Sequence, residues 1–600
     1  MKGEIKLKMK GADIIADYLV KEEVPIAVGV CGHGIIGLLD AFYERADKIK
    51  TISVRHEQAA GYIADAYFRV KHKPIVTFSS CGPGSTNLVT PIAGAFMDSS
   101  AFLCITGNIP TSQFNRGSFQ ETGRYFQGDF PSVIRSYVKK SFQPTRVEMV
   151  PLAVRQAYKE LTNGKPGPVN LDVPFDVFQE EAEVEMEEPA GYHWNIEDRV
   201  HGNPEALKKA LQLLATAKKP LIVAGNGAIL SEAGREILEF ATYMNIPVHT
   251  SPMGKGIIDE THPLCLGPTG RNGAYAANEA GKSCDVLLAL GTSFDDRATS
   301  AWLEGYTYSM NTCKLIHVDI DAREIGRNYP FELGIIGDIK MVMQQLLEMA
   351  QLTLSSNKPN YSEWLGKINE WKQIWQQYKE PLIISDALPI RPERIIADIR
   401  KVLPKNGILL SDVGVHHNWV VQYWDTYEAQ TILQAWGFAA MGFATCGVLG
   451  AKLAAPERPV VALCGDGSFM MTPHILATAV EYNIPAVWVI FNNFAYGSIR
   501  DLQQGYFGGR ELATSFTKQE SGELYNPDFV QLANSFGVQA TKVLKPQDLA
   551  AAVEYGIKLN KSYLIDVVVD RDIKPVGTGS WVLPPFKHPE PNFKPGRLVP

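Results

Sequence analysis

Short, continuous apolar runs alternate with amphipathic segments along most of the chain. Such runs predict strands buried on both faces of a parallel sheet, whereas segments with apolar residues every three or four positions predict the covering helices. The pattern fills three blocks, which we delimit at residues 1–187, 200–350 and 385–573. Because parallel strands joined by helices form doubly wound domains, the sequence predicts an α/β protein with three doubly wound parallel-sheet domains.

The segments that separate or follow the blocks are polar or irregular. An acidic link covers residues 179–188, and a polar helical stretch covers residues 352–380. The last segment, 574–600, contains seven prolines, which disfavour helices and central strands. We expect this segment to be extended, either as a disordered tail or as a strap over the protein.

The third block contains two apolar runs that flank one helical segment. The run at 459–464 ends in the sequence GDG around Asp466, and the run at 484–491 ends in NN at Asn493. A right-handed crossover makes two such strands parallel, so both side chains are expected at one edge of the sheet. A carboxylate and an amide oxygen suit Mg²⁺, which completes its coordination with phosphate oxygens and water. The pattern predicts a magnesium–diphosphate site.

Composition and charge exclude several classes of function. The chain has 600 residues, of which 45% are hydrophobic and 20% charged, and its formal net charge is −7. No basic stripe is present, so we expect no nucleic-acid partner. The longest uncharged stretch, 435–451, is shorter than the ~20 apolar residues of a membrane span. The basic N-terminus leads into an amphipathic helix rather than an export signal, so we expect a cytoplasmic protein without a membrane partner.

The eight cysteines show neither CxxC pairs nor zinc-type spacing with histidine. Most of them lie in apolar runs or tight turns. We therefore expect small buried side chains in a reducing compartment.

The GDG and NN elements, about two dozen residues apart, resemble the signature of thiamine diphosphate enzymes. A GDG alone would also fit an ordinary strand–helix–strand unit with a glycine-rich turn. The resemblance implies that Asp466 and Asn493 bind Mg²⁺ through their side chains and Ala495 through its backbone carbonyl. The turn residues expected to contact the cofactor are Gly465, Gly467 and Ser468.

Residues 50–55 predict a strand, and the segment after them predicts a helix with Glu57 in its first turn. A glutamate there is favoured by the helix dipole even without a function. The sequence RHEQAAGYIADAY, however, resembles the element in which thiamine diphosphate enzymes carry their activating glutamate. By this resemblance the Glu57 carboxyl group hydrogen bonds the aminopyrimidine ring of the cofactor and acts in proton transfer.

Further segments are similar to one branch, the acetohydroxyacid synthases, and the resemblance covers most of residues 11–570. SCGPGSTN is similar to the SGPGATN turn of that branch, and the segment beginning SFQE is similar to its FQE segment. The resemblance implies that Gln120 lies at the active site and that Lys139 lies near its entrance. His33 follows the first predicted strand, where ligands of doubly wound sheets bind. Its role is either proton transfer or purely structural.

Two more segments of the third block resemble the same branch. DVGVHHNW is similar to DVGQHQMW, which implies that Val415 and His416 contact the diphosphate. In WGFAAMGF, the resemblance implies that Ala439 offers a backbone carbonyl to the 4′-amino group and that Met441 bends the cofactor.

The middle block carries signals of a second nucleotide. Gly225 and Gly227 follow a predicted strand, which alone is a weak phosphate-loop signal. SFDDRATS and HVDIDAREIG resemble the RFDDR and DIDxxEIG elements that hold FAD in acetohydroxyacid synthases. The further residues assigned to this cofactor are Asp296, Arg297, Asp319 and Asp338.

The match to the FAD elements is incomplete. Lys165 replaces the arginine that precedes PGPV in the family, and the sequence PTG at 268–270 replaces its MHG. Related lyases hold ADP with the same fold. We therefore predict FAD, with a structural role, and keep ADP as the alternative.

The resemblance implies a thiamine diphosphate-dependent enzyme that decarboxylates a small 2-oxo acid such as pyruvate and joins the remainder to an acceptor, giving acetolactate. Leu502 stands where these synthases carry a tryptophan that shapes the acceptor pocket, so acceptor choice stays open. The alternatives are a 2-hydroxyacyl-CoA lyase or a cyclic-diketone hydrolase. A non-catalytic, nucleotide-binding regulatory subunit is disfavoured, because Glu57, Asp466 and Asn493 are all present.

The activating glutamate is in the first block, whereas the metal site is in the third. The resemblance implies that Glu57 of one chain serves the cofactor bound by another. We therefore expect a homodimer or homotetramer with active sites at the subunit interface.

Overall fold

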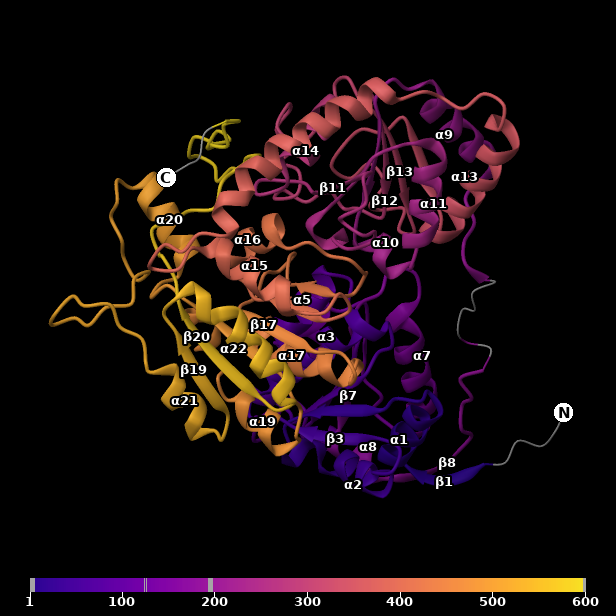
Figure 1. Cartoon of the computed structure of the whole chain (residues 1–600). Coiled ribbons are helices and arrows are strands. Elements are labelled where there is room, and N and C mark those ends of the chain that lie inside the picture. Colours follow the sequence, from indigo (N-terminus) through magenta and orange to yellow (C-terminus); the bar gives the residue numbers. More distant parts are fainter. Residues whose placement is uncertain (1–5, 124, 126, 191, 193–197, 597–600) are drawn as a thin grey trace.

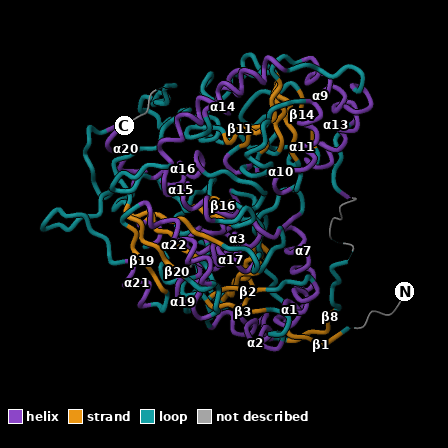
Figure 2. The backbone as a smooth tube through the Cα atoms, in the orientation of Figure 1, coloured by secondary structure: helices purple, strands orange, loops and turns teal. Residues whose placement is uncertain are grey.

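The computed structural model describes residues 6–123, 125, 127–190, 192 and 198–596, and it contains three six-stranded sheets with helices packed around them (Figures 1 and 2). Every strand pair within these three sheets is parallel. The predicted fold class, three doubly wound α/β domains, is confirmed.

The first sheet has the strand order β3-β2-β4-β5-β7-β6. Its strands are β2 (Ile26–Gly29), β3 (Lys50–Ser53), β4 (Val76–Ser79), β5 (Leu103–Asn108), β6 (Ser141–Phe142) and β7 (Val169–Pro174). Its longer helices are α1 (Gly11–Lys21), α2 (Ile36–Glu44), α3 (Glu57–Lys71), α5 (Val89–Met97) and α7 (Val150–Thr162). A short antiparallel pair, β1 (Leu7–Lys10) with β8 (Glu181–Val184), lies beside this domain.

The third sheet repeats that order as β16-β15-β17-β18-β20-β19. Its strands are β15 (Ile408–Ser411), β16 (Ile432–Gln434), β17 (Val460–Gly465), β18 (Val487–Asn492), β19 (Gln539–Val543) and β20 (Tyr563–Val568). Its helices include α15 (Pro392–Val402), α16 (His416–Tyr423), α17 (Phe443–Ala454), α18 (Asp466–Phe469), α19 (Ile475–Glu481), α20 (Gly497–Tyr506), α21 (Phe529–Ser535) and α22 (Pro546–Leu559).

The middle sheet has a different order, β11-β10-β9-β12-β13-β14. Its strands are β9 (Pro220–Ala224), β10 (Val248–Thr250), β11 (Cys265–Pro268), β12 (Val286–Leu290), β13 (Lys314–Asp319) and β14 (Leu333–Ile336). Its longer helices are α9 (Pro204–Thr216), α11 (Gly234–Met244), α12 (Tyr275–Ser283) and α13 (Ile339–Leu354), and α14 (Ser362–Ile383) leads to the third domain. Numbered along the chain, this order is 3-2-1-4-5-6, the arrangement of sheets that bind dinucleotides at the point where strand order reverses.

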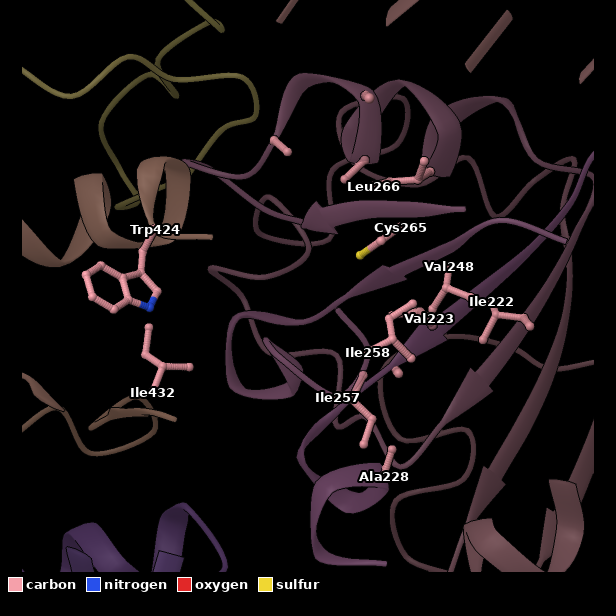
Figure 3. Packing of buried hydrophobic residues seen from close by; sticks show 14 of the residues in the cluster. Ile222, Val223, Ala228, Val248, Ile257, Ile258, Cys265, Leu266, Trp424 and Ile432 are labelled. Atoms are coloured by element: carbon pink, nitrogen blue, oxygen red, sulfur yellow. The ribbon is translucent and has the colours of Figure 1, made fainter. Parts of the chain in front are cut away.

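The hydrophobic core is continuous across domain boundaries. One cluster of buried side chains joins the middle and third domains, and Figure 3 shows Trp424 and Ile432 of the third domain with Ile257 and Ile258 of the middle domain. A second cluster joins the first and third domains through α3 and α17. The close approach of these two helices requires Gly450, because a Cβ atom there would lie 2.0 Å from the carbonyl oxygen of Ile63.

The C-terminal segment is a strap as far as it is described, which resolves the choice that the sequence left open. Thr578 donates through Oγ1 to the Gly273 carbonyl at 2.7 Å, and Phe593 packs 5.2 Å from the Trp375 ring of α14. Phe586 stacks 4.8 Å from Tyr506 at the end of α20. In Figure 1 this yellow segment lies beside α14 and α20. Residues 597–600 of the predicted tail, and residues 1–5 of the first block, lie outside the described residues.

Within the described ranges, no helix combines the length and the apolar character that crossing a bilayer would require. The stretch 435–451 instead forms a turn followed by most of α17. All eight cysteines are free and all except Cys31 are buried, as their positions in the sequence predict.

Candidate active site

The ends of β17 and β18 bring Asp466 and Asn493 together. The two strands pair in register, with Gly465 opposite Phe491, so the residues that follow them leave the sheet side by side. Both side chains are buried, Asp466 with 1% and Asn493 with 6% of its surface exposed. The convergence predicted from the GDG and NN elements is therefore present.

The Asp466 carboxylate is held by two donors at the start of α18. Its Oδ1 accepts from the Gly467 backbone N–H at 2.9 Å, and its Oδ2 accepts from Asn526 Nδ2 at 2.8 Å. Burial raises the pKa of this carboxyl group to about 6. A divalent cation would offset that desolvation, because a nearby positive charge favours the ionised form. Asn526 was not predicted, because it lies in an irregular loop without a motif.

The chain around Asn493 adds two more oxygen groups. Asn493 Oδ1 accepts from the Ala495 N–H at 3.2 Å, and Phe494 between them has a φ of 54°. A left-handed φ at a non-glycine residue is uncommon, and such residues cluster at functional sites. One carboxylate, one amide and the Ala495 carbonyl fit the oxygen preference of Mg²⁺. Accordingly, no group of three or more His, Cys, Asp or Glu side chains suited to a metal occurs in the described part of the chain.

His416 offers an unpaired polar atom beside this site. Its Nε2 is buried and has no hydrogen-bond partner among the described residues, and burial lowers the pKa of the ring to about 4. A Cβ atom on Gly465 would lie 3.4 Å from the ring, so the glycine leaves room there. Val415 packs nearby, 2.9 Å from the position of a Cβ atom on Gly497. An orphaned ring nitrogen and glycine-lined space next to a magnesium-type donor set fit a diphosphate group.

Residues of the first domain hold the segment that carries Ala439 and Met441. Asp98 accepts from the backbone N–H groups of Trp436 at 3.0 Å and Gly437 at 2.7 Å. At the other end, the Tyr62 hydroxyl donates to the Met441 carbonyl at 3.2 Å. Ala439 itself has a φ of 52°. The segment is therefore fixed at both ends by contacts that no sequence motif indicated.

The Ser468 hydroxyl forms a hydrogen bond within the third domain. Its hydroxyl oxygen and Asp412 Oδ1 each accept from the Gly442 N–H at 3.0 Å. Gly442 has a φ of 97°, which favours glycine. Asp412 also accepts from the Thr445 N–H at 3.1 Å, so it satisfies the first turn of α17.

In the first domain, Glu57 lies at the N-terminal end of α3 against the turn between β4 and α4 (Pro83–Asn87). Its Oε2 accepts from Asn87 Nδ2 at 2.9 Å, and its Oε1 lies 3.1 Å from the position of a Cβ atom on Gly84. The carboxyl group is buried, with 9% of the residue exposed. The glutamate element and the SCGPGSTN turn therefore meet at one site.

His33 and Gln120 both lie close to Cys81 of the same turn. The His33 Nε2 and Cys81 Sγ atoms are 3.7 Å apart, and Gln120 Oε1 is 3.9 Å from the same sulfur. Gln120 has a φ of 62°, and its neighbour Phe119 lies 5.5 Å from the His33 ring. The structure brings these two predicted residues together and adds Cys81, whose position in the motif had suggested only packing.

Lys139 binds backbone carbonyl oxygens at the C-terminal end of α7. Its Nζ donates to the carbonyl oxygens of Glu160 at 2.5 Å and Asn163 at 2.6 Å, and burial lowers its pKa to about 8. These carbonyls are among those that a helix end leaves unpaired. The lysine therefore has a structural task here, and its predicted place at the active-site entrance stays a prediction.

The glycines of the middle domain lie where the strand order reverses, between β9 and β12. The Gly227 N–H donates to the Gly291 carbonyl at 2.9 Å, and a Cβ atom on Gly225 would lie 2.3 Å from that oxygen. The two turns thus approach each other closely at the expected nucleotide crevice.

Asp319 and Lys165 lie close to that crevice. Asp319 ends β13, and burial raises the pKa of its carboxyl group to about 6. Lys165 from the first domain pairs with Glu324 at 2.8 Å, so the lysine that replaces the family arginine is tied to this region.

The remaining predicted nucleotide residues have partners within the protein. Asp296 Oδ2 accepts from Trp581 Nε1 at 2.8 Å, and Arg297 Nη2 donates to Asn418 Oδ1 at 3.0 Å. Asp338 caps α13 by accepting from the Lys340 N–H at 3.0 Å. Asp296 and Arg297 therefore face the third domain and the strap, whereas Asp338 has a capping role.

Comparison with known families and proteins agrees with this arrangement. The chain matches the N-terminal thiamine pyrophosphate-binding domain of thiamine pyrophosphate enzymes over residues 9–127, their central domain over residues 207–346 and their C-terminal thiamine pyrophosphate-binding domain over residues 412–567. Each match falls on a different one of the three parallel sheets; the first ends before β6 and β7, and the third begins after β15.

Full-length relatives cover nearly the whole chain. A probable acetolactate synthase large subunit of Methanocaldococcus jannaschii is 37% identical over 94% of this chain and 92% of its own length. The acetolactate synthase large subunit of Cyanidium caldarium is 35% identical over 93% of both chains, and that of Haemophilus influenzae is 31% identical over 94% and 95%. Identity at this level over the full length shows that the chain belongs to the thiamine pyrophosphate enzymes, in the group of the acetolactate synthase large subunits.

Proposed function

We propose that this protein condenses two molecules of pyruvate to acetolactate and carbon dioxide, with thiamine diphosphate and Mg²⁺ as cofactors. The observation that carries the proposal is the buried set of Asp466, Asn493 and the unpaired His416 Nε2 at one strand edge. When bound, thiamine diphosphate supplies the carbon nucleophile and the electron sink for decarboxylation.

The residues of this chain supply binding, orientation and proton transfer. Asp466, Asn493 and the Ala495 carbonyl hold Mg²⁺, and His416 with Val415 contacts the diphosphate. Ala439 and Met441 orient the rings, because Asp98 and Tyr62 fix their segment. The proposed magnesium and diphosphate ligands all come from the third domain.

Proton transfer falls to the first domain. Glu57, held by Asn87, hydrogen bonds the aminopyrimidine ring. His33, beside Cys81 and Gln120, gives and takes the proton that the acceptor oxygen requires as a carbonyl becomes a hydroxyl.

A homodimer completes the active site, with Glu57 of one chain facing the cofactor of its partner. Apolar side chains are exposed at both half-sites: Phe119 is 76% exposed beside His33, and Phe438 and Met470 are 42% and 41% exposed near the cofactor segments. Such clusters support coverage by another surface. The relatives are named as large subunits, which also supports an assembly.

FAD occupies the middle domain in this proposal, with a structural role. The support is the strand order, the close glycine turns at Gly225 and Gly227, and the buried Asp319. An absorbance spectrum of the purified protein distinguishes FAD, which has a visible band, from ADP, which has none.

Purified protein with thiamine diphosphate, Mg²⁺ and pyruvate is expected to form acetolactate, which acid converts to acetoin for detection. Absence of acetolactate together with cleavage of a 2-hydroxyacyl-CoA or a cyclic diketone would replace the proposal by the corresponding lyase or hydrolase. Sedimentation analysis of the purified protein is expected to give a dimer or tetramer of this chain. Cell fractionation is expected to recover the protein in the cytoplasmic fraction.

A further inference from the structure

A cavity of about 470 Å³ lies between α14, α15 and the segment that follows α16. In the fold α15 packs against both of the other helices (Figure 1). Among the described residues, none of those that line the cavity belongs to the proposed active site or to the nucleotide crevice of the middle domain. Its volume is within the ~300–1,000 Å³ range of sites for small ligands. The cavity is therefore examined as a second ligand site.

The charged side chains that line this cavity are mostly cationic. The positive ones come from the end of α14 and from the end of α15 with the loop after it, namely Lys379, Arg400, Lys401 and Lys405. Within the described lining they face a single carboxylate, that of Asp425. A concave surface with an excess of one sign of charge concentrates ions of the opposite sign. The charge balance of the cavity therefore favours an anionic ligand.

Arg400 is the buried member of this cationic group, with 9% of its surface exposed. Its Nη2 donates to the carbonyl oxygens of Leu403 and Pro404, just beyond the end of α15. Its Nε and Nη1 atoms are buried and have no hydrogen-bond partner among the described residues. The guanidinium carbon lies 4.4 Å from the Trp424 ring centre and 5.0 Å from that of Tyr427. The fold thus fixes the position of this charge without neutralising it, and an anion in the cavity would offset the cost of its burial.

Lys379 adds a second unneutralised charge on the opposite wall. Within the described ranges it forms neither an ion pair nor a hydrogen bond. Burial lowers the pKa of its amino group, and the negative charge of Asp425 opposes that shift only in part. Lys405 is drawn to the same space, because its Nζ lies 4.9 Å from the ring centre of Tyr427, which also contacts Arg400. A bound anion would raise the pKa of Lys379, because an opposite charge favours the ionised form.

A phosphate group suits this set of donors, because it carries close to two negative charges and three acceptor oxygens. Arginine and lysine are the side chains that commonly bind it. We propose that the cavity between α14 and α15 binds a small phosphate-bearing anion at a site separate from the active site. The rings of Tyr423 and Tyr427, which also line the cavity, offer apolar surface to an organic group attached to the phosphate. The inference goes beyond the proposed function and does not depend on it.

Isothermal titration calorimetry of the protein saturated with thiamine diphosphate, Mg²⁺ and FAD tests the proposal, because these cofactors fill the other phosphate-binding sites. Inorganic phosphate and AMP are the probes, and adenosine is the uncharged control. We expect saturable binding of AMP or phosphate and none of adenosine, and the tighter of the two anions identifies the source of the phosphate group. Absence of saturable binding by both, or equal competition by potassium chloride at the same ionic strength, would overturn the inference. Release of the flavin in step with AMP binding would assign AMP to the middle domain and would also overturn it.

Lys379→Gln is the decisive variant, because it removes a charge that has no partner in the fold. The dissociation constant of the bound probe should rise about 10- to 100-fold, since a charge-assisted hydrogen bond is lost. The thermal unfolding midpoint without the probe should equal or exceed that of the wild type. Lys405→Gln changes an exposed side chain and should raise the dissociation constant a few-fold.

Lys367→Gln is the matched control, because this lysine is on the same helix, is 54% exposed and does not line the cavity. Its affinity for the probe should equal that of the wild type. Unchanged affinity in both Lys379→Gln and Lys405→Gln would overturn the inference. A lower unfolding midpoint of Lys379→Gln would show that the amino group has a structural partner, which would overturn it as well.

Discussion

The first and third domains can be compared residue by residue at one point of their sheets. Asp172 in β7 accepts from Asn108, the last residue of β5, at 2.6 Å, and Asp566 in β20 accepts from Asn492, the last residue of β18, at 2.8 Å. Each aspartate is the fourth residue of its strand. In the pairing with the neighbouring strand, it lies opposite the residue two positions before the asparagine. The two domains therefore share both a strand order and one buried polar bridge.

The same two sheets differ at the loops beyond their strand ends. The first presents Glu57 with the Asn87 amide as its partner, whereas the third presents Asp466 within a group of oxygen ligands. The first arrangement suits proton exchange with a ring, and the second suits a cation. The comparison indicates that the shared strand order creates the same sheet edge in both domains. The residues in the loops at that edge determine which chemistry it supports.

The largest expected effect comes from Glu57→Gln. This change removes the acid–base group but keeps its shape, so turnover should fall roughly 10²- to 10⁴-fold while cofactor binding stays within a few-fold of the wild type. Steady-state kinetics and a fluorescence titration with thiamine diphosphate measure the two quantities. Glu148→Gln, on an exposed glutamate, is the control. Full turnover in Glu57→Gln would contradict the assignment of proton transfer to the first domain and of metal binding to the third.

Asp466→Asn should change cofactor binding, the quantity that Glu57→Gln leaves nearly unaltered. We expect metal-dependent cofactor binding to be lost, because the amide supplies no charge to Mg²⁺. Asn526→Ala removes the partner of this carboxylate, together with a hydrogen bond to Asn492 Oδ1, and should weaken binding by roughly 10- to 100-fold. Titrations of thiamine diphosphate with and without EDTA test both variants, and Asp548→Asn on the surface of α22 is the control. Tight binding by Asp466→Asn in EDTA would refute a metal-mediated diphosphate site.

The smallest expected effect concerns the shared aspartates. Burial raises the pKa of Asp172 to about 6 from an ordinary value of 3.8, so between these values the native state binds a proton that the unfolded state releases. The free energy of unfolding should therefore fall as pH rises through this window, by about 1–3 kcal/mol for this group. Asp172→Asn should flatten the slope.

Urea unfolding midpoints from pH 4 to pH 7 measure this slope. Burial also raises the pKa of Asp566, so Asp566→Asn should change the slope in the same direction. Opposite changes in the two variants would show that the bridges are not equivalent.

The sequence predicted the parts of the protein that depend on local pattern. The runs at 459–464 and 484–491 became β17 and β18, and their register brought Asp466 and Asn493 together. Glu57 is in the first turn of α3 for the same reason. In each of these cases a strand ends, or a helix begins, at or next to the functional residue.

The contacts missed by the sequence depend on packing between distant segments. Asn526 reaches Asp466 from an irregular loop, and Asp98 and Tyr62 hold a segment more than 300 positions away. The periodicity of hydrophobic residues along the sequence does not predict which loops will come into contact. The hydrogen bond from Thr578 to Gly273 is of the same kind, since it joins the strap to the middle domain.

The strap also has a consequence for the order of assembly during synthesis. Thr578 and Trp581, which bind Gly273 and Asp296 of the middle domain, follow all three sheets in the chain and leave the ribosome after them. Because domains fold as they emerge, the sheets can form before the strap has made these contacts. A nascent chain thus acquires its three folded sheets first and the contacts of the C-terminal strap last.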